Sequence, residues 1–432
     1  MDQRISRLLH FVPRAAFHNA RTDILQSSTQ GAKLQGMKWI ARTQSKRLSV
    51  LLGAFPVVLI SGPRQCGKST LARAQYPTWR HLDLERPVDL GVLTADLEGF
   101  FDAHPRRVVI DEAQRLPELF DVLRHVVDRS QTKGRFLLLG SASPALMRNV
   151  SESLAGRIGL LELGPFSAAE LAHVPRRLDR WFWGGYPPVH ALRNARDRVH
   201  WLDSYVSTFL ERDLPALGFR FSPQRLRLLW TMLTHVHGNL LNVSDLARSL
   251  TVSPHTVSDH LDVLEAAYMI RRLPPFHANV QKRLSKMSKI YVRDSGLLHF
   301  LAGLREPREL LSWPRRGQSF EGLVIEELTN LAAEHAVRPE FFFWRTSGGA
   351  EVDLLIRDGR RLVPIEIKLG VAVDRHRVAG LRQCMTDLGL TKGYVIANTK
   401  ERHMIGTQIE VIPWTEVVHR QFDFGLGMQR GR

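Results

Sequence analysis

The stretch VVLISGPRQCGKSTLAR, residues 57–73, places an apolar run directly before the pattern Gly62-x-x-x-x-Gly67-Lys68-Ser69. This pattern constrains the fold because it needs a buried strand, a tight glycine-rich loop and a helix in that order. The glycines let backbone N–H groups curl round phosphate oxygens at the amino end of the helix. We therefore predict a nucleotide-binding loop within a parallel sheet that helices cover.

The side chains of this loop have separate expected roles. Lys68 is expected to reach the β- and γ-phosphates, and the Ser69 hydroxyl is expected to ligate Mg²⁺. The predicted cofactors are therefore ATP and Mg²⁺. The predicted nucleotide-contacting residues of the loop are Gly62, Pro63, Arg64, Gln65, Cys66, Gly67, Lys68, Ser69 and Thr70.

A second predicted strand, in RRVVIDEAQRLPELF, delivers two acids, Asp111 and Glu112, at its carboxyl end. Ligands of open α/β sheets bind at that edge. Asp111 suits the magnesium shell of the nucleotide, and Glu112 can orient or deprotonate the attacking water as the catalytic base. The pair indicates hydrolysis of the nucleotide. The alternative is that the two acids only cap the next helix.

The next predicted strand, in RFLLLGSAS, leads to Ser141 and Ser143, which we expect to sense the γ-phosphate. Arg157, in SESLAGRIG, has the sequence position of an arginine finger, the catalytic cation that a neighbouring subunit inserts to stabilise transition-state charge. An ordinary surface arginine is the alternative for Arg157.

Together, GPRQCGKST, IDEAQ, LLGSAS, SLAGR and the later GGYP and FLERDL resemble a large group of bacterial and archaeal AAA+ ATPases. The resemblance covers residues 37–414. It implies an ATPase domain, then a winged helix, then a C-terminal region similar to restriction-endonuclease folds. It also implies a homo-oligomer, for which a ring is one candidate arrangement. Cys66 departs from the small or apolar residue that is commoner in this loop, where the chemistry uses backbone groups.

Sixty Lys and Arg residues against 43 Asp and Glu give the chain a formal charge of +17. This excess favours a polyanionic partner, nucleic acid before a membrane surface and DNA in the first place. The alternative is that the charge only keeps the protein in solution. Two cysteines without CxxC spacing support neither disulfides nor structural zinc, and a reducing cytoplasm fits. No run is apolar for long enough to span a membrane.

The predicted fold class is α/β, with a parallel AAA+ sheet domain, a helical winged-helix domain and a restriction-endonuclease-like C-terminal domain. The first segment resembles a basic tail, an upstream start or an organellar transit peptide. The predicted divisions are 1–36 (basic extension), 37–175 (AAA+ P-loop ATPase domain), 176–222 (helical lid or linker), 223–305 (winged helix), 306–418 (nuclease-like domain) and 419–432 (flexible tail).

The stretch NVSDLARSLTVSPHTVSDHLDVLEAAYMI is typical of a helix-turn-helix, with Ser244 and Ser253 as the expected helix caps. Asp259 and Asp262 face outward on the second helix and would repel phosphates, so we do not expect this helix to read bases. The basic segment that follows is a better candidate for phosphate contacts, through Lys282, Arg283, Lys286 and Lys289. The alternative is a lid or subunit contact without DNA.

The stretch GGAEVDLLIRDGRRLVPIEIKLG contains Asp353, followed by Glu366-x-Lys368. If residues 358–359 form a two-residue hairpin turn, residues whose numbers sum to 717 face each other. Because side chains alternate along strands, Glu351 and these three residues then share one face. Such a face can hold Mg²⁺ through Asp353 and Glu366 and activate water for phosphodiester attack. The alternative is a charged face exposed to solvent.

The preceding helix, SFEGLVIEELTNLAAEH, places Glu321 inside an apolar stripe, whereas Glu326 is expected to face solvent. A carboxylate on an apolar face needs a partner. The helix acid, the strand acid and the Glu-Ile-Lys sequence resemble the PD-(D/E)xK nuclease pattern. The resemblance implies that Gln383, on the following helix, supports a site whose catalytic residues are Glu321, Asp353, Glu366 and Lys368.

The sequence thus favours an oligomeric AAA+ ATPase that remodels or translocates nucleic acid and carries a nuclease-like domain competent for Mg²⁺-dependent cleavage. The alternative is a nucleotide-gated regulatory switch whose C-terminal domain binds protein or DNA without catalysis. The two differ in turnover, because a motor requires ATPase activity stimulated by DNA and a switch hydrolyses ATP slowly and independently of it.

Overall fold

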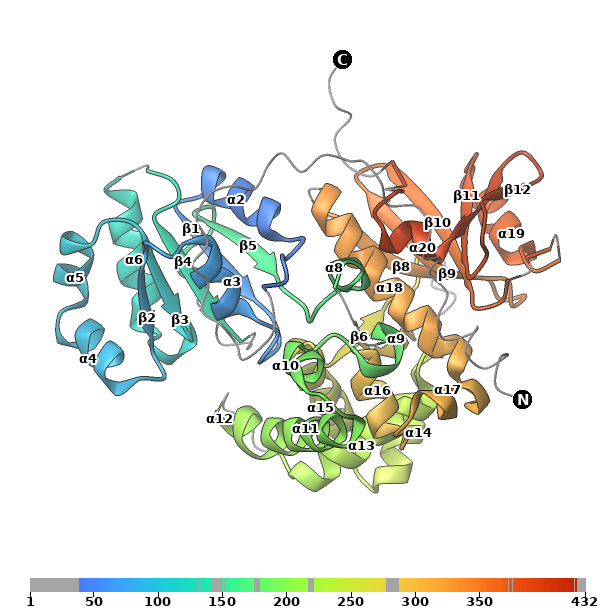
Figure 1. The fold of residues 1–432 in the computed structure, drawn as a ribbon, viewed down its shortest axis with the longest axis horizontal. Helices are drawn as coiled ribbons and strands as arrows, with labels where there is room; N and C mark the ends of the chain where they lie inside the picture. Colours follow the sequence, from blue (N-terminus) through green and yellow to red (C-terminus); the bar gives the residue numbers. More distant parts are fainter. Residues whose placement is uncertain are drawn as a thin grey trace, which may run out of the picture.

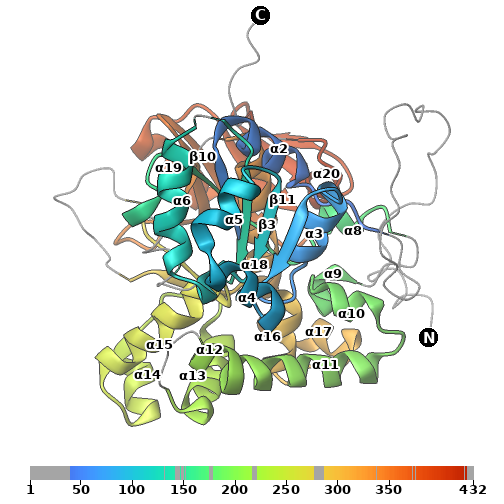
Figure 2. The same ribbon diagram turned by 90° about the vertical axis from the view of Figure 1, so that its left-hand side faces the viewer.

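Three bodies follow one another along the chain in the computed structural model (Figure 1): an N-terminal body (39–174) with a five-stranded sheet, a mainly helical middle body (179–313) with a two-stranded sheet, and a C-terminal body (316–425) with a six-stranded sheet. Figure 2 shows the helices of the middle body beneath the other two bodies. No described helix is both long and apolar enough to cross a membrane. The structure describes residues 39–425, except 131, 142–145, 147–149, 151, 175–178, 217–220, 277–286, 337, 372, 375 and 423.

The N-terminal sheet is parallel throughout and has the strand order β2-β3-β4-β1-β5. The strands predicted before the phosphate loop, before the paired acids and within RFLLLGSAS are confirmed as β1, β3 and β4. Helices cover both faces, so every residue of β1 is buried, which explains its continuous apolar run. The strands are β1 (Val57–Ser61), β2 (Arg80–Asp83), β3 (Val108–Asp111), β4 (Phe136–Gly140) and β5 (Ile158–Glu162).

Two hydrophobic cores lie on the two faces of this sheet. One face packs against α2 (Ser45–Ala54) and α3 (Lys68–Gln75). The other packs against α4 (Pro87–Ala95), α5 (Leu97–Ala103) and α6 (Glu118–Asp128), which follows the short helix η1 (Ala113–Arg115). The short helix α8 (Ala168–Leu171) then leads the chain toward the other bodies.

The middle body has one hydrophobic core that runs from Phe182 to Leu310. The segment predicted as a lid or linker therefore packs together with the helices that follow it. The elements are α9 (Arg180–Trp183), α10 (Pro187–Ala191), α11 (Ala195–Thr208), the π-helix η2 (Phe209–Asp213), α12 (Leu214–Ala216), α13 (Pro223–Val236), α14 (Val243–Leu250), α15 (Pro254–Ala266), β6 (Ile270–Leu273), β7 (Lys289–Val292), α16 (Ser295–Leu301) and α17 (Pro307–Ser312).

The turn predicted between α14 and α15 is present, and one of its two expected caps is correct. The Ser253 hydroxyl accepts a hydrogen bond from the Thr256 N–H at 3.1 Å and caps α15. The cap of α14 is Asn242, not Ser244, because the Asn242 side chain accepts from the N–H groups of Ser244 and Asp245. Asn and Ser are comparable caps, so the sequence alone did not distinguish them.

The C-terminal sheet has the strand order β12-β13-β11-β10-β9-β8 and is mixed, with β10, β11 and β13 parallel. Helix α18 (Arg316–His335) covers one face and α19 (Ala379–Leu388) the other. The remaining elements are β8 (Glu340–Arg345), β9 (Glu351–Asp358), β10 (Arg361–Lys368), β11 (Gly393–Ala397), β12 (His403–Ile405), β13 (Ile409–Pro413) and α20 (Trp414–Val418).

The hairpin of β9 and β10 differs in register from the predicted one. Ile365 pairs with Leu354, so paired residue numbers sum to 719 rather than 717, and the turn lies one residue further along the chain. A shift of two in this sum keeps every side chain on its predicted face, because the alternation has a period of two. Continued by one residue, the register places Asp353 opposite Glu366.

Glu326 on α18 is buried, and the expectation that it faces solvent is wrong. Its carboxylate accepts hydrogen bonds from Arg271 at 2.5 and 3.0 Å and from Arg293 at 3.0 Å. Burial alone would raise the pKa of Glu326, but the two arginines outweigh burial and hold this pKa at about 2. Both arginines belong to the middle body, so the helical periodicity of α18 carried no information about them.

We expect Glu326→Gln to destabilise the protein by about 3–5 kcal/mol at pH 7, because the buried guanidinium groups of Arg271 and Arg293 lose a countercharge. The pKa of Glu326 is lower in the folded than in the unfolded chain. This carboxylate therefore stabilises the fold above a pH of about 4.5, and the contribution is lost as the pH falls toward 2.

Urea unfolding of the parent and Glu326→Gln between pH 7 and pH 3 checks both statements. Glu340→Gln is the matched control, because Glu340 makes a similar two-bond pair with Arg357 on the surface and should change the midpoint little. Equal midpoints for the two variants at pH 7 would contradict the prediction.

Candidate active site

The predicted phosphate-binding loop leaves β1 and enters α3, whose first residue is Lys68. A Cβ atom on Gly62 would lie 2.1 Å from the carbonyl oxygen of Leu163, so only glycine fits there. Gly67 and Gln65 have positive φ angles of 101° and 60°, which turn the loop back on itself. The loop thus surrounds the amino end of α3, where the first N–H groups of a helix lack intrahelical partners.

Two of the predicted side chains lie where phosphate and metal would bind. The Lys68 ammonium is buried within the loop and donates to the carbonyl oxygens of Gly62 at 2.9 Å and Pro63 at 3.0 Å. The Ser69 side chain forms a hydrogen bond with the Asp111 carboxylate. The structure therefore brings together the two residues predicted to hold Mg²⁺, one from the first turn of α3 and one from the end of β3.

The paired acids lie at the carboxyl end of β3, as predicted. Glu112 has a left-handed backbone (φ 54°), which is uncommon for a residue other than glycine, and Gln114 donates to its carboxylate. Burial raises the pKa of Asp111 and Glu112, and nearby Lys68 opposes both shifts. A carboxylate with a raised pKa accepts a proton from water more readily, which suits the predicted role of Glu112.

Ser141 lies between the loop and the acids, because β4 runs between β1 and β3. Its hydroxyl is buried without a hydrogen-bond partner among the described residues, and the same holds for the side-chain oxygen of Gln114. Unpartnered buried polar groups indicate a ligand that would complete them. This edge of the sheet therefore fits a nucleotide with Mg²⁺. Ser143 lies outside the described residues.

The other loop residues serve different contacts. The Arg64 guanidinium pairs with Glu85 at 2.5 Å and with Asp213 of η2 in the middle body. Cys66 is buried, and Thr70 is exposed on the first turn of α3. Arg64 thus links the loop to the FLERDL sequence, a connection that no local pattern revealed.

Arg157 lies at the amino end of β5, where its carbonyl oxygen accepts from the Val57 N–H at 3.3 Å. The phosphate loop follows the carboxyl end of the neighbouring parallel strand β1, so Arg157 lies at the opposite ends of the strands. Its guanidinium pairs with Asp128 at 2.6 Å on the surface. Arg157 is therefore remote from the nucleotide site of its own subunit, and its role as a finger for a neighbouring subunit stays a prediction.

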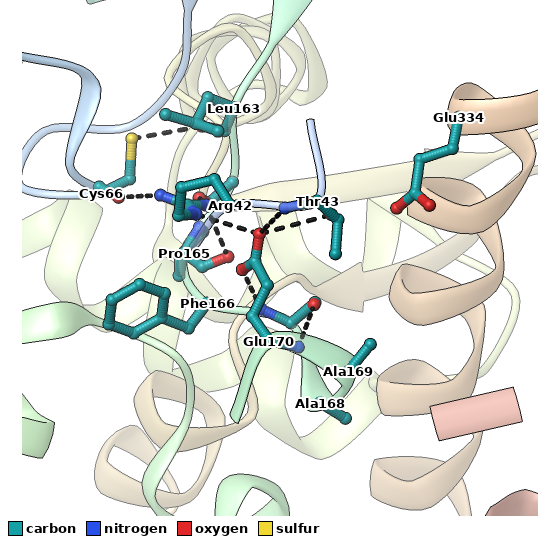
Figure 3. Close-up of polar contacts among 12 residues, drawn as sticks. Arg42, Thr43, Cys66, Leu163, Pro165, Phe166, Ala168, Ala169, Glu170 and Glu334 are labelled. Atoms are coloured by element: carbon teal, nitrogen blue, oxygen red, sulfur yellow. Dashed lines mark hydrogen bonds and ion pairs between the residues drawn. The ribbon is translucent and has the colours of Figure 1, made fainter. Parts of the chain in front are cut away.

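Arg42, a residue outside every predicted motif, stabilises the phosphate loop through its guanidinium. Figure 3 shows its guanidinium between the loop and α8. It donates to the carbonyl oxygens of Cys66 at 2.8 Å and Gly164 at 2.6 Å, and pairs with Glu170 at 3.0 Å. Both charged side chains are almost fully buried. A single arginine ahead of a helix forms no pattern, so the sequence carried no signal for this role.

In the C-terminal body, the hairpin brings together three of the predicted residues, Asp353, Glu366 and Lys368. The Lys368 ammonium pairs with Glu366, and Asp353 accepts from the Ile367 N–H at 2.8 Å. The second carboxylate oxygen of Glu366, Oε2, is buried and has no partner in the part of the chain that the structure describes. Burial, followed by the proximity of Asp353, raises the pKa of Glu366 to about 8.

Glu321 joins this group from α18, and Lys289 joins it from β7 of the middle body. The expectation that Lys289 contacts DNA phosphates is wrong, because its side chain is 3% exposed. Its ammonium lies 2.6 Å from Glu351, 3.2 Å from Glu321 and 3.5 Å from Asp353. Tyr291 donates to Glu321 at 2.5 Å. Burial and then Asp353 raise the pKa of Glu321 to about 7, while Lys289 opposes the shift.

The carboxylate oxygens suit a hard dication, but their arrangement does not. Among the described residues, no three Asp, Glu, His or Cys side chains are placed to hold a metal ion. The Mg²⁺ site predicted at Asp353 and Glu366 therefore does not fit this arrangement, in which an ammonium lies among the carboxylates. Gln383 does not support the group either, since it is exposed and donates to Asp387 at 2.7 Å.

Comparison with known families divides the chain into three matches. Residues 54–172 match an AAA domain. Residues 174–308 match a domain of unknown function (DUF8612), which spans both the predicted lid and the predicted winged helix. Residues 316–417 match a second domain of unknown function (DUF4143).

Among solved structures, a Walker-type ATPase of Pyrococcus abyssi is 18% identical, with a TM-score of 0.41 over 60% of this chain and 94% of that chain. RuvB of Thermotoga maritima is 21% identical, with a TM-score of 0.28 over 53% of this chain and 88% of that chain.

Two mycobacterial proteins are similar along nearly the whole chain. The uncharacterized proteins Rv2008c of Mycobacterium tuberculosis and Mb2031c of Mycobacterium bovis are each 38% identical over 410 residues, which cover 94% of this chain and 89% of theirs. The chain belongs to the family of these mycobacterial proteins, and its N-terminal body is an AAA-type P-loop ATPase domain.

Proposed function

We propose that this ATPase acts on nucleic acid, DNA in the first place, as an oligomer that couples ATP hydrolysis to remodelling or translocation. The observation that carries the proposal is the meeting of Lys68, Asp111 and Glu112 at the carboxyl edge of one parallel sheet. Their arrangement supports hydrolysis rather than nucleotide binding alone, because an acid of raised pKa lies beside the residues that hold the phosphates.

The proposed reaction assigns one task to each residue of this edge. Lys68 exchanges the carbonyl oxygens of Gly62 and Pro63 for phosphate oxygens. Mg²⁺, held by Ser69 and Asp111, would neutralise phosphate charge when bound. Glu112 accepts the proton of the attacking water, and the unpartnered Ser141 hydroxyl contacts the γ-phosphate.

The nucleic-acid partner is proposed from charge. The excess of 17 positive charges favours contact with phosphates, which releases counterions and makes binding sensitive to salt. The helix-turn-helix arrangement of α14 and α15 supports a winged-helix interpretation of the middle body. The wing residues Lys282, Arg283 and Lys286 lie outside the described residues.

A second candidate function is a nucleotide-gated switch whose C-terminal body binds a partner without catalysis. The position of Lys289 favours it, because an ammonium lies where a nuclease-like site would need a metal ion.

The nuclease-like interpretation of residues 306–418 is supported by the shared face of Asp353, Glu366 and Lys368.

We expect Lys68→Ala to abolish nucleotide binding or turnover. Glu112→Gln should keep ATP affinity and lose turnover by about 100-fold or more, because only the proton acceptor is removed. Binding of a fluorescent ATP analogue and release of phosphate measure the two effects separately. Glu118→Gln, an exposed acid at the start of α6, is the control and should hydrolyse ATP at the parental rate. Parental turnover in Glu112→Gln would remove Glu112 as the base.

ATPase turnover measured with duplex, single-stranded and branched DNA tests the proposed function. We expect at least one DNA form to stimulate turnover, and we expect the stimulation to fall steeply as salt rises from 50 to 200 mM, a range over which phosphate contacts weaken by orders of magnitude. Slow turnover that none of the three forms changes would favour the switch.

DNA cleavage by the parent protein and by Asp353→Asn tests the nuclease-like interpretation. We expect any cleavage in Mg²⁺ or Mn²⁺ to be lost in Asp353→Asn while ATPase turnover stays at the parental rate, because the two sites belong to different bodies. If the parent cuts neither linear, circular nor branched DNA, the C-terminal body is a binding module.

A further inference from the structure

A cluster of buried and partly buried carboxylates in the C-terminal body is contacted by a lysine of the middle body, Lys289. We define this cluster as Glu321, Glu351, Asp353 and Glu366. The ammonium lies within 3.5 Å of the first three of these carboxylates, at 2.6 Å from the nearest. It therefore occupies a position in which several carboxylate oxygens meet, which is the position that a bound cation takes.

The packing around Lys289 fixes the ammonium there. Tyr291, two residues further along β7, points to the same face and donates to Glu321. The Lys289 ammonium also lies 5.8 Å from the centre of the Phe343 ring. A lysine that is 3% exposed would be costly without countercharges, so the cluster and the lysine stabilise each other.

The fourth acid shows that one cation does not complete the cluster. Lys368 pairs with one oxygen of Glu366, and the other oxygen is buried without a partner among the residues described. Glu366 itself is only 7% exposed. A buried carboxyl oxygen normally has a hydrogen-bond partner, so the contacts of Lys289 and Lys368 leave this oxygen of the cluster unsatisfied.

We propose that Lys289 is the resident cation of the carboxylate cluster and excludes a divalent metal, so that a metal binds only when this ammonium is withdrawn. The proposal rests on the nuclease-like interpretation of the C-terminal body. Lysine and metal compete because both need the same oxygens of Glu321 and Asp353. The position of β7 relative to α18 and β9 thus decides which cation the cluster holds.

The test is Mn²⁺ binding by Lys289→Met, which keeps the length and apolar stem of the side chain and removes its charge. In the absence of nucleotide and DNA, we expect Lys289→Met to bind one Mn²⁺ at least ten-fold more tightly than the parent, by calorimetry and by the electron paramagnetic resonance of free Mn²⁺. The added site should disappear in Lys289→Met/Asp353→Asn.

Two controls distinguish the loss of the positive charge at position 289 from the effect of changing this side chain or of removing a lysine elsewhere. Lys289→Arg keeps a cation and should bind Mn²⁺ no better than the parent. Lys392→Met removes a half-exposed lysine that pairs with Glu410 elsewhere in the C-terminal body, and should also match the parent. Mn²⁺ should raise the melting temperature of Lys289→Met and leave that of the parent unchanged.

If Lys289→Met does not fold, Lys289→Met/Glu351→Gln takes its place, because the double substitution removes one negative and one positive charge and keeps the net charge of the cluster and residue 289 together unchanged. Parental ATPase turnover shows which of the two variants folds. If that variant binds Mn²⁺ no more tightly than the parent, the proposal is overturned. Tight Mn²⁺ binding by the parent that Asp353→Asn abolishes would also overturn it. These outcomes are independent of DNA-stimulated ATPase turnover and of cleavage, so failure of the proposed function is recognised separately.

Discussion

Buried charged side chains with partners far away along the chain hold the bodies together, both internally and against one another. Within the N-terminal body, the pair of Arg42 and Glu170 fastens the segment before α2 to the phosphate loop and to α8. Between bodies, Glu326 fastens α18 to two arginines of the middle body. An isolated buried charge costs several kcal/mol, so each of these residues depends on a partner from a distant part of the chain. The shape of the phosphate loop is therefore maintained partly from outside its own motif.

Helix α18 is the element on which the contacts between bodies meet. Glu327 accepts from the Ala168 N–H at 2.8 Å, at the amino end of α8, and so caps a helix of the N-terminal body. Nearer the amino end of the same helix, Glu321 belongs to the carboxylate cluster, while Glu326 bonds to the middle body. Because α8 also carries the partner of Arg42, polar contacts extend from the phosphate loop to α18, the helix that carries Glu321. This continuity gives a nucleotide-gated switch a physical route, although coupling itself requires two arrangements of these elements.

Local patterns predicted those features in which a residue and its structural neighbours are close in sequence. The strand, loop and helix around Lys68 and the cap at Ser253 are of this kind. The hairpin of β9 and β10 was predicted with the wrong register, yet with Asp353 and Glu366 on the correct face, because alternation depends only on whether residue numbers are odd or even. The solvent-facing position expected for Glu326 was wrong, because periodicity reports one helix and not what packs against it.

The sequence by itself determined the parallel sheet with its phosphate loop and the two acids that end β3, because glycine spacing and apolar runs restrict the local backbone directly. Only the tertiary structure decided that Arg42 supports the loop, that Arg157 lies at the opposite edge of the sheet, and that Lys289 enters the carboxylate cluster. The physical reason is that a buried charge is stabilised by its partners in space, and these partners come from segments whose separation along the chain carries no pattern.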